Sequence, residues 1–377
     1  MNLAFWSDSI IPSTAANAIQ VMKMCNAFTK LGHHTTLHAK KPSIAKETDL
    51  DQLANIYGVT TNFKIVSHRS HQYIRHLDYD AKVLISVLKS KPDLIFTRSL
   101  RGAFLTNFFN KKVVLELHFL PTTNSNSLML KQLARGTCLK KIIVISENLK
   151  NLLLSEHPYL SSVPIEVCHD AVDIDRFPVS ETSPIERKIE LSIDIQKKIV
   201  MYVGHLYEGR GINLIEQLAK SLPEVNFIVI GGLEKDVADR KHRLSRLQIT
   251  NLYYYGFIPN AQLPDYYQIA DLLIMPYEKT VSVSGGGDTS AWMSPMKTFE
   301  YMASGKPLIS SDLPALREVL NEEVAILVEP GNLEHWKYSI ENTLTNETLA
   351  NKISTNARQK AERNTWESRA NKILSYL

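Results

Sequence analysis

The stretch Ser294-Pro-Met-Lys-Thr-Phe-Glu-Tyr-Met-Ala-Ser-Gly-Lys-Pro-Leu-Ile-Ser-Ser-Asp312 predicts a helix that leads directly into a buried strand. Ser294 is a favourable N-cap, and Pro295 fits the first helical position, where a missing N–H costs nothing. Gly305 suits the position just after the helix, and Pro307 prevents the helix from resuming. A helix followed at once by a buried strand is typical of an α/β domain.

The start of this helix also carries chemistry. The free N–H groups of its first turn and the positive end of its dipole form an anion site, to which Lys297 adds a full charge. Glu300 lies on the second turn, where a carboxylate could accept hydrogen bonds from a pair of ribose hydroxyls. Ser294, Lys297 and Glu300 therefore predict a sugar-nucleotide site. The alternative is an ordinary capped helix that binds no phosphate.

Two further segments follow in a fixed order, Ser311-Asp-Leu-Pro-Ala-Leu-Arg-Glu318 and Val328-Glu-Pro-Gly-Asn332. Together with Glu300-Tyr-Met-Ala-Ser-Gly-Lys-Pro307, they resemble the group 1 family of retaining glycosyltransferases (glycosyltransferase family 4). The resemblance is firm from about residue 140 to 377 and thin over residues 40–110. It implies the GT-B fold: an α/β protein of two doubly wound Rossmann-like domains whose parallel sheets face each other across a cleft.

Length and composition agree with a soluble two-domain protein. The chain has 377 residues, of which 44% are hydrophobic and 22% charged, enough for two cores. No window approaches the ~18–20 uninterrupted apolar residues of a membrane span, and we expect no signal peptide at the N-terminus. Cys25, Cys138 and Cys168 stand apart in apolar contexts. They predict buried thiols in a cytoplasmic protein, without a disulfide framework or a zinc site.

The net charge of +4 is distributed unevenly. Residues 1–178 hold 21 Lys and Arg against 14 Asp and Glu, whereas the remaining residues hold 22 against 25. A basic first half suits an anionic acceptor or peripheral contact with an anionic membrane surface. The alternative is an ordinary solvated surface. We expect no nucleic-acid partner.

Short β-branched runs alternate with helical patterns along the chain, which predicts parallel sheets with helices on both faces. A polar stretch from about 180 to 197 predicts the connection between two such halves. We therefore expect residues 1–180 to form an acceptor-side domain and residues 181–365 a donor-binding domain. The resemblance implies that the last helix, residues 366–377, packs back on the first domain. The expected strands are residues 3–6, 34–39, 64–66, 94–97, 113–117, 141–145, 199–203, 225–230, 252–255, 272–275 and 308–311.

The segment Val203-Gly-His-Leu-Tyr-Glu-Gly-Arg-Gly-Ile212 opens the second half. Small residues such as Gly204 let the backbone approach a phosphate, and the Arg210 guanidinium can bind two oxygens at once. The alternative is a structural turn. In the resembled family this loop supplies two basic diphosphate contacts. Arg210 matches the second, and His205 stands at the first, so its contribution would depend on its protonation.

Two more segments match the donor side of the resembled family. Gly256-Phe-Ile-Pro259 matches the segment whose backbone holds the nucleobase, so Phe257 and Ile258 are predicted contacts. The loop Ser282-Val-Ser-Gly-Gly-Gly-Asp-Thr-Ser290 matches the donor loop, and Gly286 and Gly287 let its backbone approach a sugar closely. The alternatives are a strand-to-turn corner and a flexible surface loop.

The chain departs from the family at Trp292. The family signature has two glutamates with seven residues between them, of which Glu300 is the second. Trp292 occupies the place of the first, which contacts the donor sugar. We expect either that Asp288, the only carboxylate between Glu278 and Glu300, takes over this contact or that the donor sugar differs. The alternative is lost activity.

In the first half, His118 follows an expected buried strand, and the carboxyl end of such a strand lies at the ligand-binding edge of an α/β domain. In the resembled family a histidine at this place meets the donor sugar beneath the leaving group. The loop over residues 10–18 faces the same edge, and Asn17 is our choice for contact with a hydroxyl-rich acceptor. The alternative is a structural histidine.

These expectations lead to a retaining glycosyltransferase that moves a sugar from a nucleoside-diphosphate sugar, of UDP or GDP type, to a hydroxyl acceptor. His118, Arg210, Lys297 and Asp288 are the expected catalytic groups. No Asp-x-Asp motif lies where it could hold a metal on the phosphates, so we expect neither metal nor cofactor. The acceptor would be a surface polysaccharide or a lipid-linked saccharide at the inner membrane face. The alternatives are a sugar-nucleotide epimerase or phosphorylase of the same fold, and a non-catalytic sugar-nucleotide-binding partner subunit.

Overall fold

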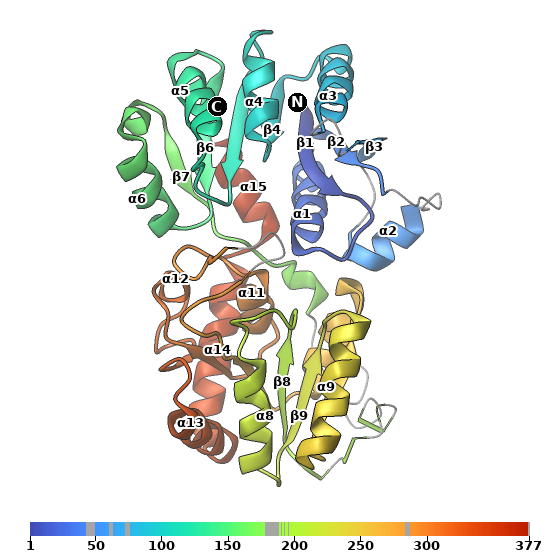
Figure 1. Ribbon diagram of the computed structural model, residues 1–377, viewed down its shortest axis with the longest axis vertical. Coiled ribbons are helices and arrows are strands. Elements are labelled where there is room, and N and C mark those ends of the chain that lie inside the picture. Colours follow the sequence, from blue (N-terminus) through green and yellow to red (C-terminus); the bar gives the residue numbers. More distant parts are fainter. Residues whose placement is uncertain are drawn as a thin grey trace. The chain divides into compact units, whose positions relative to one another are not determined.

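The computed structural model describes residues 1–42, 50–59, 63–71, 76–177, 188–189, 191, 193–194, 196–282 and 287–375. The chain divides into two compact units. The first unit consists of Met1–Asp170 with Trp366–Leu377, and the second of Ala171–Thr365. Each unit contains one parallel sheet with its own helices (Figure 1).

The first unit is built on a seven-stranded parallel sheet in the order β3-β2-β1-β4-β5-β6-β7. Its central strands are buried along almost their whole length, as expected of a sheet covered on both faces. The order reverses direction beside β1, so the carboxyl ends of β1, β4 and β5 meet at one edge. The elements are β1 (Asn2–Ile10), α1 (Ala16–Lys30), β2 (His34–Lys40), α2 (Leu50–Tyr57), β3 (Lys64–His68), α3 (Leu77–Ser90), β4 (Leu94–Thr97), α4 (Leu100–Asn107), β5 (Val113–Leu117), α5 (Asn124–Arg135), β6 (Leu139–Val144), α6 (Glu147–Glu156), η2 (Pro158–Ser162) and β7 (Ile165–Val167).

The last helix of the chain, α15 (Trp366–Leu374), belongs to this first unit and packs on α1. In Figure 1 it is the red helix among the blue and green elements. Polar contacts add to this packing: Lys141 Nζ donates to the Ser375 carbonyl oxygen at 2.9 Å, and Lys372 Nζ donates to the Val167 carbonyl oxygen at 2.7 Å. The end of the chain is thereby joined to β6 and β7.

The second unit repeats the architecture with a six-stranded parallel sheet in the order β10-β9-β8-β11-β12-β13. The direction again reverses at the first strand of the unit, β8, which pairs with β9 on one side and β11 on the other. The elements are η3 (Ile174–Arg176), β8 (Ile199–Val203), α8 (Ile212–Ser221), β9 (Asn226–Ile230), α9 (Glu234–Leu247), β10 (Leu252–Gly256), η4 (Asn260–Gln262), α10 (Leu263–Ile269), β11 (Leu272–Met275), α11 (Met296–Ala303), β12 (Leu308–Ser311), α12 (Pro314–Arg317), β13 (Ile326–Val328), α13 (Leu333–Thr345) and α14 (Glu347–Glu362).

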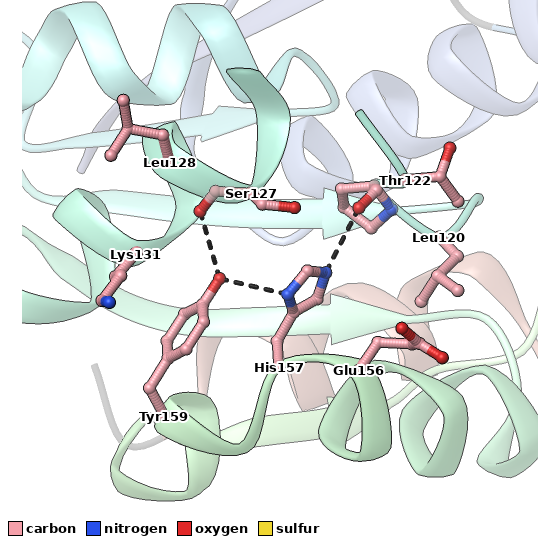
Figure 2. Close-up of a pocket in the computed structure, with 9 residues that line it drawn as sticks. Leu120, Thr122, Ser127, Leu128, Lys131, Glu156, His157 and Tyr159 are labelled. Atoms are coloured by element: carbon pink, nitrogen blue, oxygen red, sulfur yellow. Dashed lines mark hydrogen bonds between the residues drawn. The ribbon is translucent and has the colours of Figure 1, made fainter. Parts of the chain in front are cut away.

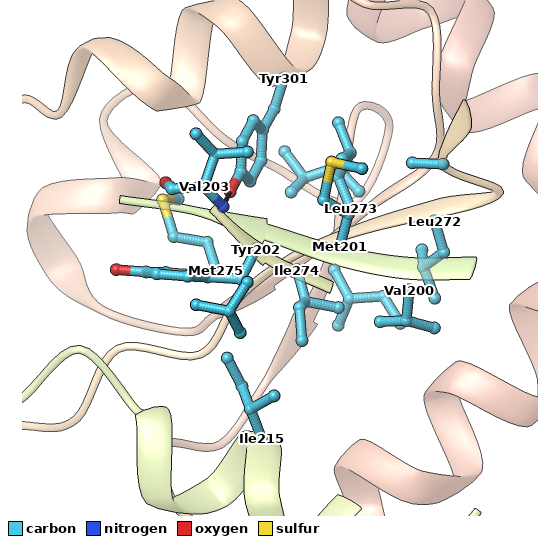
Figure 3. Packing of buried hydrophobic residues seen from close by; sticks show 14 of the residues in the cluster. Val200, Met201, Tyr202, Val203, Ile215, Leu272, Leu273, Ile274, Met275 and Tyr301 are labelled. Atoms are coloured by element: carbon cyan, nitrogen blue, oxygen red, sulfur yellow. Dashed lines mark hydrogen bonds between the residues drawn. The ribbon is translucent and has the colours of Figure 1, made fainter. Parts of the chain in front are cut away.

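The core of the second unit lies on β8 and β11. Figure 3 shows the side chains of these strands packed against one another and against Ile215 of α8. Tyr301 of α11 is fully buried, yet its hydroxyl accepts from the Val203 N–H at 2.8 Å. The contact satisfies a polar group that would otherwise be costly to bury. It also ties α11 to the carboxyl end of β8.

The expected strands are confirmed in both units, and several elements were not predicted. These include α2, α12, β7, β13 and the pair α13 and α14. Among the helices of the described part of the chain, none combines the length and apolarity that crossing a membrane requires.

Candidate functional site

The loop that leaves β8 depends on close backbone approaches. Gly204 directly follows β8, and a Cβ there would lie 2.0 Å from Lys297 Nζ and 2.8 Å from the Tyr202 hydroxyl. Gly209 has a φ of 81°, and its Cβ would lie 2.0 Å from the Thr280 carbonyl oxygen. At Gly209 the clash would be with backbone, so no larger residue fits, whereas at Gly204 a larger residue would displace the Lys297 ammonium and crowd the Tyr202 hydroxyl. The two glycines thus let Lys297 and the segment after β11 approach this loop.

Two cations meet on the ring of Tyr277, which follows β11. Arg210 Cζ lies 4.7 Å and Lys297 Nζ 5.2 Å from the ring centroid. Lys297 Nζ also lies 4.4 Å from the Tyr202 ring centroid and donates to its hydroxyl at 3.2 Å. Arg210 donates to the Ser282 carbonyl oxygen at 3.3 Å, and its Nε is buried without a partner among the described residues. We call Arg210, Lys297, Tyr202 and Tyr277 the cation cluster.

The cation cluster carries an excess of positive charge. Within the described part of the chain, no carboxylate lies within 4.0 Å of either cation. Burial alone would raise the pKa of Tyr277, but Arg210 and Lys297 lower it. At Tyr202 burial prevails over Lys297, and the pKa is raised. Aromatic faces stabilise a cation only modestly, by about 0.5–2 kcal/mol, so an anion with several oxygens is the natural partner of the cluster.

His205 contacts this cluster as a neutral group. Burial, with the charges of Lys297 and Arg210, lowers its pKa to about 4. Its ring stacks on Tyr207 at 4.7 Å between centroids and 9° between planes, and its carbonyl oxygen accepts from the Tyr202 hydroxyl at 2.9 Å. At pH 7 His205 therefore offers hydrogen-bonding nitrogens and no further charge.

Helix α11 brings Lys297 and Glu300 to this edge. The helix begins at Met296, with Pro295 at the N-cap position and no side-chain cap. The prediction that Ser294 caps the helix is wrong, because Pro295 still has extended backbone (φ −72°, ψ 126°). Ser294 itself is buried. The predicted helix end is confirmed, since Gly305 follows α11 with a left-handed φ of 70°.

Glu300 is held in place by two donors. Tyr267 donates its hydroxyl to Oε2 at 2.9 Å, and Asn260 Nδ2 donates to Oε1 at 2.8 Å. Asn260 is fixed in turn by Arg176, which donates to its side-chain and backbone oxygens at 2.8 and 2.6 Å. The half-buried carboxylate is therefore orientated before any ligand arrives, and its remaining lone pairs can accept from hydroxyls.

The structure assigns Asp288 to the closure of its own loop. Its Oδ1 accepts from the N–H groups of Val281 and Ser290, each at 2.9 Å, and Oδ2 accepts from the Ser290 hydroxyl at 2.9 Å. Burial alone would raise its pKa, but these hydrogen bonds lower it. Gly287 is exposed with a φ of 88°. The predicted contact Gly286 lies outside the described residues.

The predicted nucleobase contacts follow the carboxyl end of β10. Phe257 is 45% exposed, while Ile258 packs on the core. In the same unit, the ends of β8 and β11 carry the cation cluster. The strand ends of this sheet thus bring the predicted donor-side residues to one edge, as its topology requires.

In the first unit, His118 belongs to a buried charge network. It contacts Glu116 through Nε2, and burial together with the charge of Arg98 lowers its pKa to about 4. Because the ring is neutral, its Nε2–H donates to the carboxylate, which leaves Nδ1 as an acceptor. Burial alone would raise the pKa of Glu116, but Arg369, His118 and Arg98 lower it. Arg369 donates to the two Glu116 oxygens at 3.1 and 3.4 Å.

Asn17 is exposed in the first turn of α1 and touches the same network. Its carbonyl oxygen accepts from Arg98 Nη1 at 3.5 Å, and the same nitrogen donates to Gln20 Oε1 at 2.9 Å. Gln20 Nε2 donates to Glu116 Oε1 at 2.8 Å. Asn17 and His118 are therefore joined through a continuous set of polar contacts.

A hollow of about 590 Å³ opens elsewhere in the first unit, between the loop after β5, α5 and the end of α6. Figure 2 shows the Tyr159 hydroxyl between Ser127 and His157. It donates to the Ser127 carbonyl oxygen and contacts His157 Nδ1, each at 3.2 Å, and His157 Nε2 contacts the Pro121 carbonyl oxygen. These contacts join Tyr159 and His157 to backbone carbonyl oxygens of the wall itself. No predicted site residue lines this hollow.

Several residues of the site were missed from the sequence. Tyr202 and Tyr277 lie in or beside apolar strands and look like ordinary core residues. Asn260 directly follows the predicted nucleobase segment, which is the signal that could have found it. Arg98 stands directly after a predicted strand, as His118 does, and the same rule would have selected it.

The comparisons with solved structures identify the class of fold. The chain superposes on Anabaena HepE, solved in complex with UDP, with a TM-score of 0.74 at 15% identity, over 99% of this chain and 98% of that one. At this identity the likeness shows the fold alone. The chain has the GT-B fold of two parallel-sheet α/β domains, so the predicted fold class is confirmed.

The sequence comparisons narrow this class. Residues 185–360, a little under half of the chain, match the family model described as "Glycosyl transferases group 1". A processive diacylglycerol alpha-glucosyltransferase of Acholeplasma laidlawii is 22% identical over 52% of this chain and 55% of that protein. A D-inositol 3-phosphate glycosyltransferase of Mycobacteroides abscessus is 24% identical over 62% of this chain and 51% of that protein. The chain thus spans only about half the length of these relatives, and its second unit is similar to group 1 glycosyltransferases.

Proposed function

We propose that this protein is a retaining glycosyltransferase that transfers a sugar from a nucleoside-diphosphate sugar to a hydroxyl acceptor. The observation that carries the proposal is the cation cluster: Arg210 and Lys297 share one tyrosine ring without a carboxylate partner in the described part of the chain. Departure of a diphosphate builds negative charge, and preorganised cations stabilise such charge best. The match to group 1 glycosyltransferases supports the same reaction.

Four of the predicted donor contacts have a stated role in this proposal. Arg210 and Lys297 bind the diphosphate, with the backbone of Gly204 beside it. Glu300, orientated by Tyr267 and Asn260, accepts from the ribose hydroxyls. The proposal includes no metal and no cofactor, because the two cations supply the charge that a metal would bring to the phosphates.

In the first unit, we assign His118 to the donor sugar and Asn17 to the acceptor. As a neutral ring that donates to Glu116, His118 can accept from a sugar hydroxyl through Nδ1. Asp288 contacts the sugar in place of the carboxylate that Trp292 replaces. In doing so it would exchange a hydrogen bond within its own loop for one to the ligand.

For the acceptor we propose a surface polysaccharide or a lipid-linked saccharide. One relative is named as acting on diacylglycerol, which supports a lipid-linked acceptor. The excess of Lys and Arg over Asp and Glu in residues 1–178 suits peripheral contact with the anionic inner face of a membrane. The protein would then be cytoplasmic.

Turnover tests the proposal directly. The purified chain is incubated with UDP- and GDP-sugars and a panel of polysaccharide and glycolipid acceptors, and the products are identified by mass spectrometry with NMR of the anomeric centre. Lys297→Ala is the test variant, and Lys279→Ala, at an exposed site, is the matched control. Transfer with retention that is lost only in Lys297→Ala supports the proposal, whereas inversion contradicts the retaining assignment.

One rival function has a specific observation in its favour. Trp292 stands where the resembled family has a carboxylate, which favours a non-catalytic subunit that binds a sugar nucleotide for a partner. That function requires donor binding without turnover for every donor and acceptor pair. A free-sugar product or a requirement for phosphate would instead favour an epimerase or phosphorylase.

A further inference from the structure

Arg98 directly follows β4, at the carboxyl edge of the sheet in the first unit. The residue is half-buried, and the two contacts to Gln20 and Asn17 described above both use Nη1. A guanidinium has five N–H donors. The donors on Nε and Nη2 have no hydrogen-bond partner among the described residues. Neither nitrogen is among the buried polar atoms that lack a partner, so these donors are open to solvent. Arg98 therefore keeps open donors on an ordered side chain.

The neighbouring arginine shows what a structural role looks like here. Arg369 is 5% exposed and bonds both oxygens of Glu116. Arg98, in contrast, contacts the amide of Gln20, and Gln20 separates it from Glu116. Among the described residues no carboxylate lies within 4.0 Å of the Arg98 guanidinium. Its charge is therefore left without a direct ion partner.

The other charges nearby do not neutralise it. Burial raises the pKa of Asp170 to about 7, although Arg369 opposes this shift, so Asp170 is only partly ionised at neutral pH. Burial and the charge of Arg369 lower the pKa of Arg98 against the attraction of Glu116, Asp170 and Asp8. An arginine stays protonated nonetheless. Arg98 and Arg369 are therefore two permanent cations beside one buried permanent anion, Glu116.

We propose that Arg98 is the centre of an anion subsite in the first unit, which binds a phosphate or carboxylate group of the acceptor. Arginine recognises both groups through paired N–H donors. Ligands of open α/β sheets bind outside the carboxyl ends of the strands, where Arg98 lies together with His118 and the exposed Asn17. The subsite rests on these contacts alone, and its assignment to the acceptor rests on the proposed function.

Inorganic phosphate is the probe for the subsite itself. It is titrated by calorimetry into the full chain carrying Arg210→Ala and Lys297→Ala, so that the cation cluster cannot bind it. We expect phosphate to bind this variant and Arg98→Gln to weaken binding about tenfold or more. Arg101→Gln is the matched control, since Arg101 already pairs with Asp80 at 2.8 Å, and it should change little.

Arg98→Lys keeps the charge but loses the paired donors, so it should weaken phosphate binding less than Arg98→Gln does. It also preserves the test if Arg98→Gln fails to fold. The subsite is overturned if phosphate does not bind, or if neither Arg98→Gln nor Arg98→Lys changes the affinity for phosphate.

A second titration separates acceptor from donor. UDP affinity is measured for the chain that carries Arg98→Gln alone. An unchanged UDP affinity supports the acceptor assignment. A loss of UDP affinity as large as that of Arg210→Ala would mean that Arg98 binds an anionic group of the donor, and it would overturn the assignment. Failure of every turnover assay would contradict the proposed function, but the phosphate titration would still decide the subsite.

Discussion

Two regions of the molecule, the Glu116 network of the first unit and the cation cluster of the second, treat buried charge in opposite ways. In the first, Glu116 is 1% exposed and its oxygens accept from Arg369, Gln20 and His118. In the second, Arg210 and Lys297 lie on tyrosine rings with no carboxylate beside them in the described part of the chain. Removing one partner of a buried ion pair leaves the other charge uncompensated and destabilises the fold, whereas a charge that has no ion partner is available to a ligand. Substitutions in the Glu116 network should therefore reduce stability, whereas substitutions in the cation cluster should reduce ligand binding.

Arg369→Ala should give the greatest loss of stability. The variant leaves the buried carboxylate of Glu116 without its cation, which typically costs about 3–5 kcal/mol. The free energy of unfolding is measured by denaturant titration. Glu367→Ala is the control on the same helix, because its 2.7 Å pair with Lys30 is partly exposed and worth about 1 kcal/mol or less. Equal effects of the two variants would show that the Glu116 network does not stabilise the first unit.

Arg210→Ala and Lys297→Ala should behave in the opposite way. Each removes a cation that lacks an ion partner, so we expect the unfolding free energy to stay within about 1 kcal/mol of the wild type. Donor-dependent kcat/KM should fall by about 2–4 kcal/mol, the usual effect of losing a preorganised charge contact. Thermal unfolding and steady-state kinetics measure the two quantities. A variant that unfolds readily but turns over normally would show that the cation cluster stabilises the fold and does not bind the donor.

Glu300→Gln should weaken donor binding by about 1–3 kcal/mol, because the neutral amide is a poorer acceptor for ribose hydroxyls. The measurement is calorimetric affinity for UDP, with the exposed Glu278→Gln as control. A 2′,3′-dideoxy nucleotide provides the second comparison. If it binds the wild type as tightly as UDP does, Glu300 does not hold the ribose.

Asp288→Ala should have the least effect on the fold. The residue is exposed, and loss of its loop contacts should cost about 1 kcal/mol or less in unfolding free energy. If Asp288 contacts the donor sugar, turnover should fall clearly while UDP affinity stays near that of the wild type. Equal turnover in the variant and the wild type would mean that Asp288 closes its own loop and does not contact the donor sugar.

Local signals were enough to predict the fold and part of the site. Lys297 and Glu300 could be placed because helix start and stop signals flank them, and Arg210 because it ends a glycine-containing loop after a strand. Tyr202 and Tyr277 were not predicted, because a tyrosine that carries a cation looks in the sequence like any core aromatic. The pairing of Glu116 with Arg369 joins positions far apart in the chain, so no local pattern reveals it. The two ends of α11 show that local signals are not always sufficient. Gly305 was correctly predicted to follow the helix, but Ser294 was wrongly predicted to cap its start.

The central claim is that Arg210 and Lys297 hold a nucleoside diphosphate, and calorimetric titration tests it most directly. UDP and GDP are each titrated into the wild type, Arg210→Ala, Lys297→Ala and the control Lys279→Ala. We predict that at least one of the two nucleotides binds the wild type and the control equally. Its affinity should fall about tenfold or more, equivalent to about 1.4 kcal/mol, in each cluster variant. Equal affinity in all four proteins, or no binding of either nucleotide to the wild type, would contradict the claim.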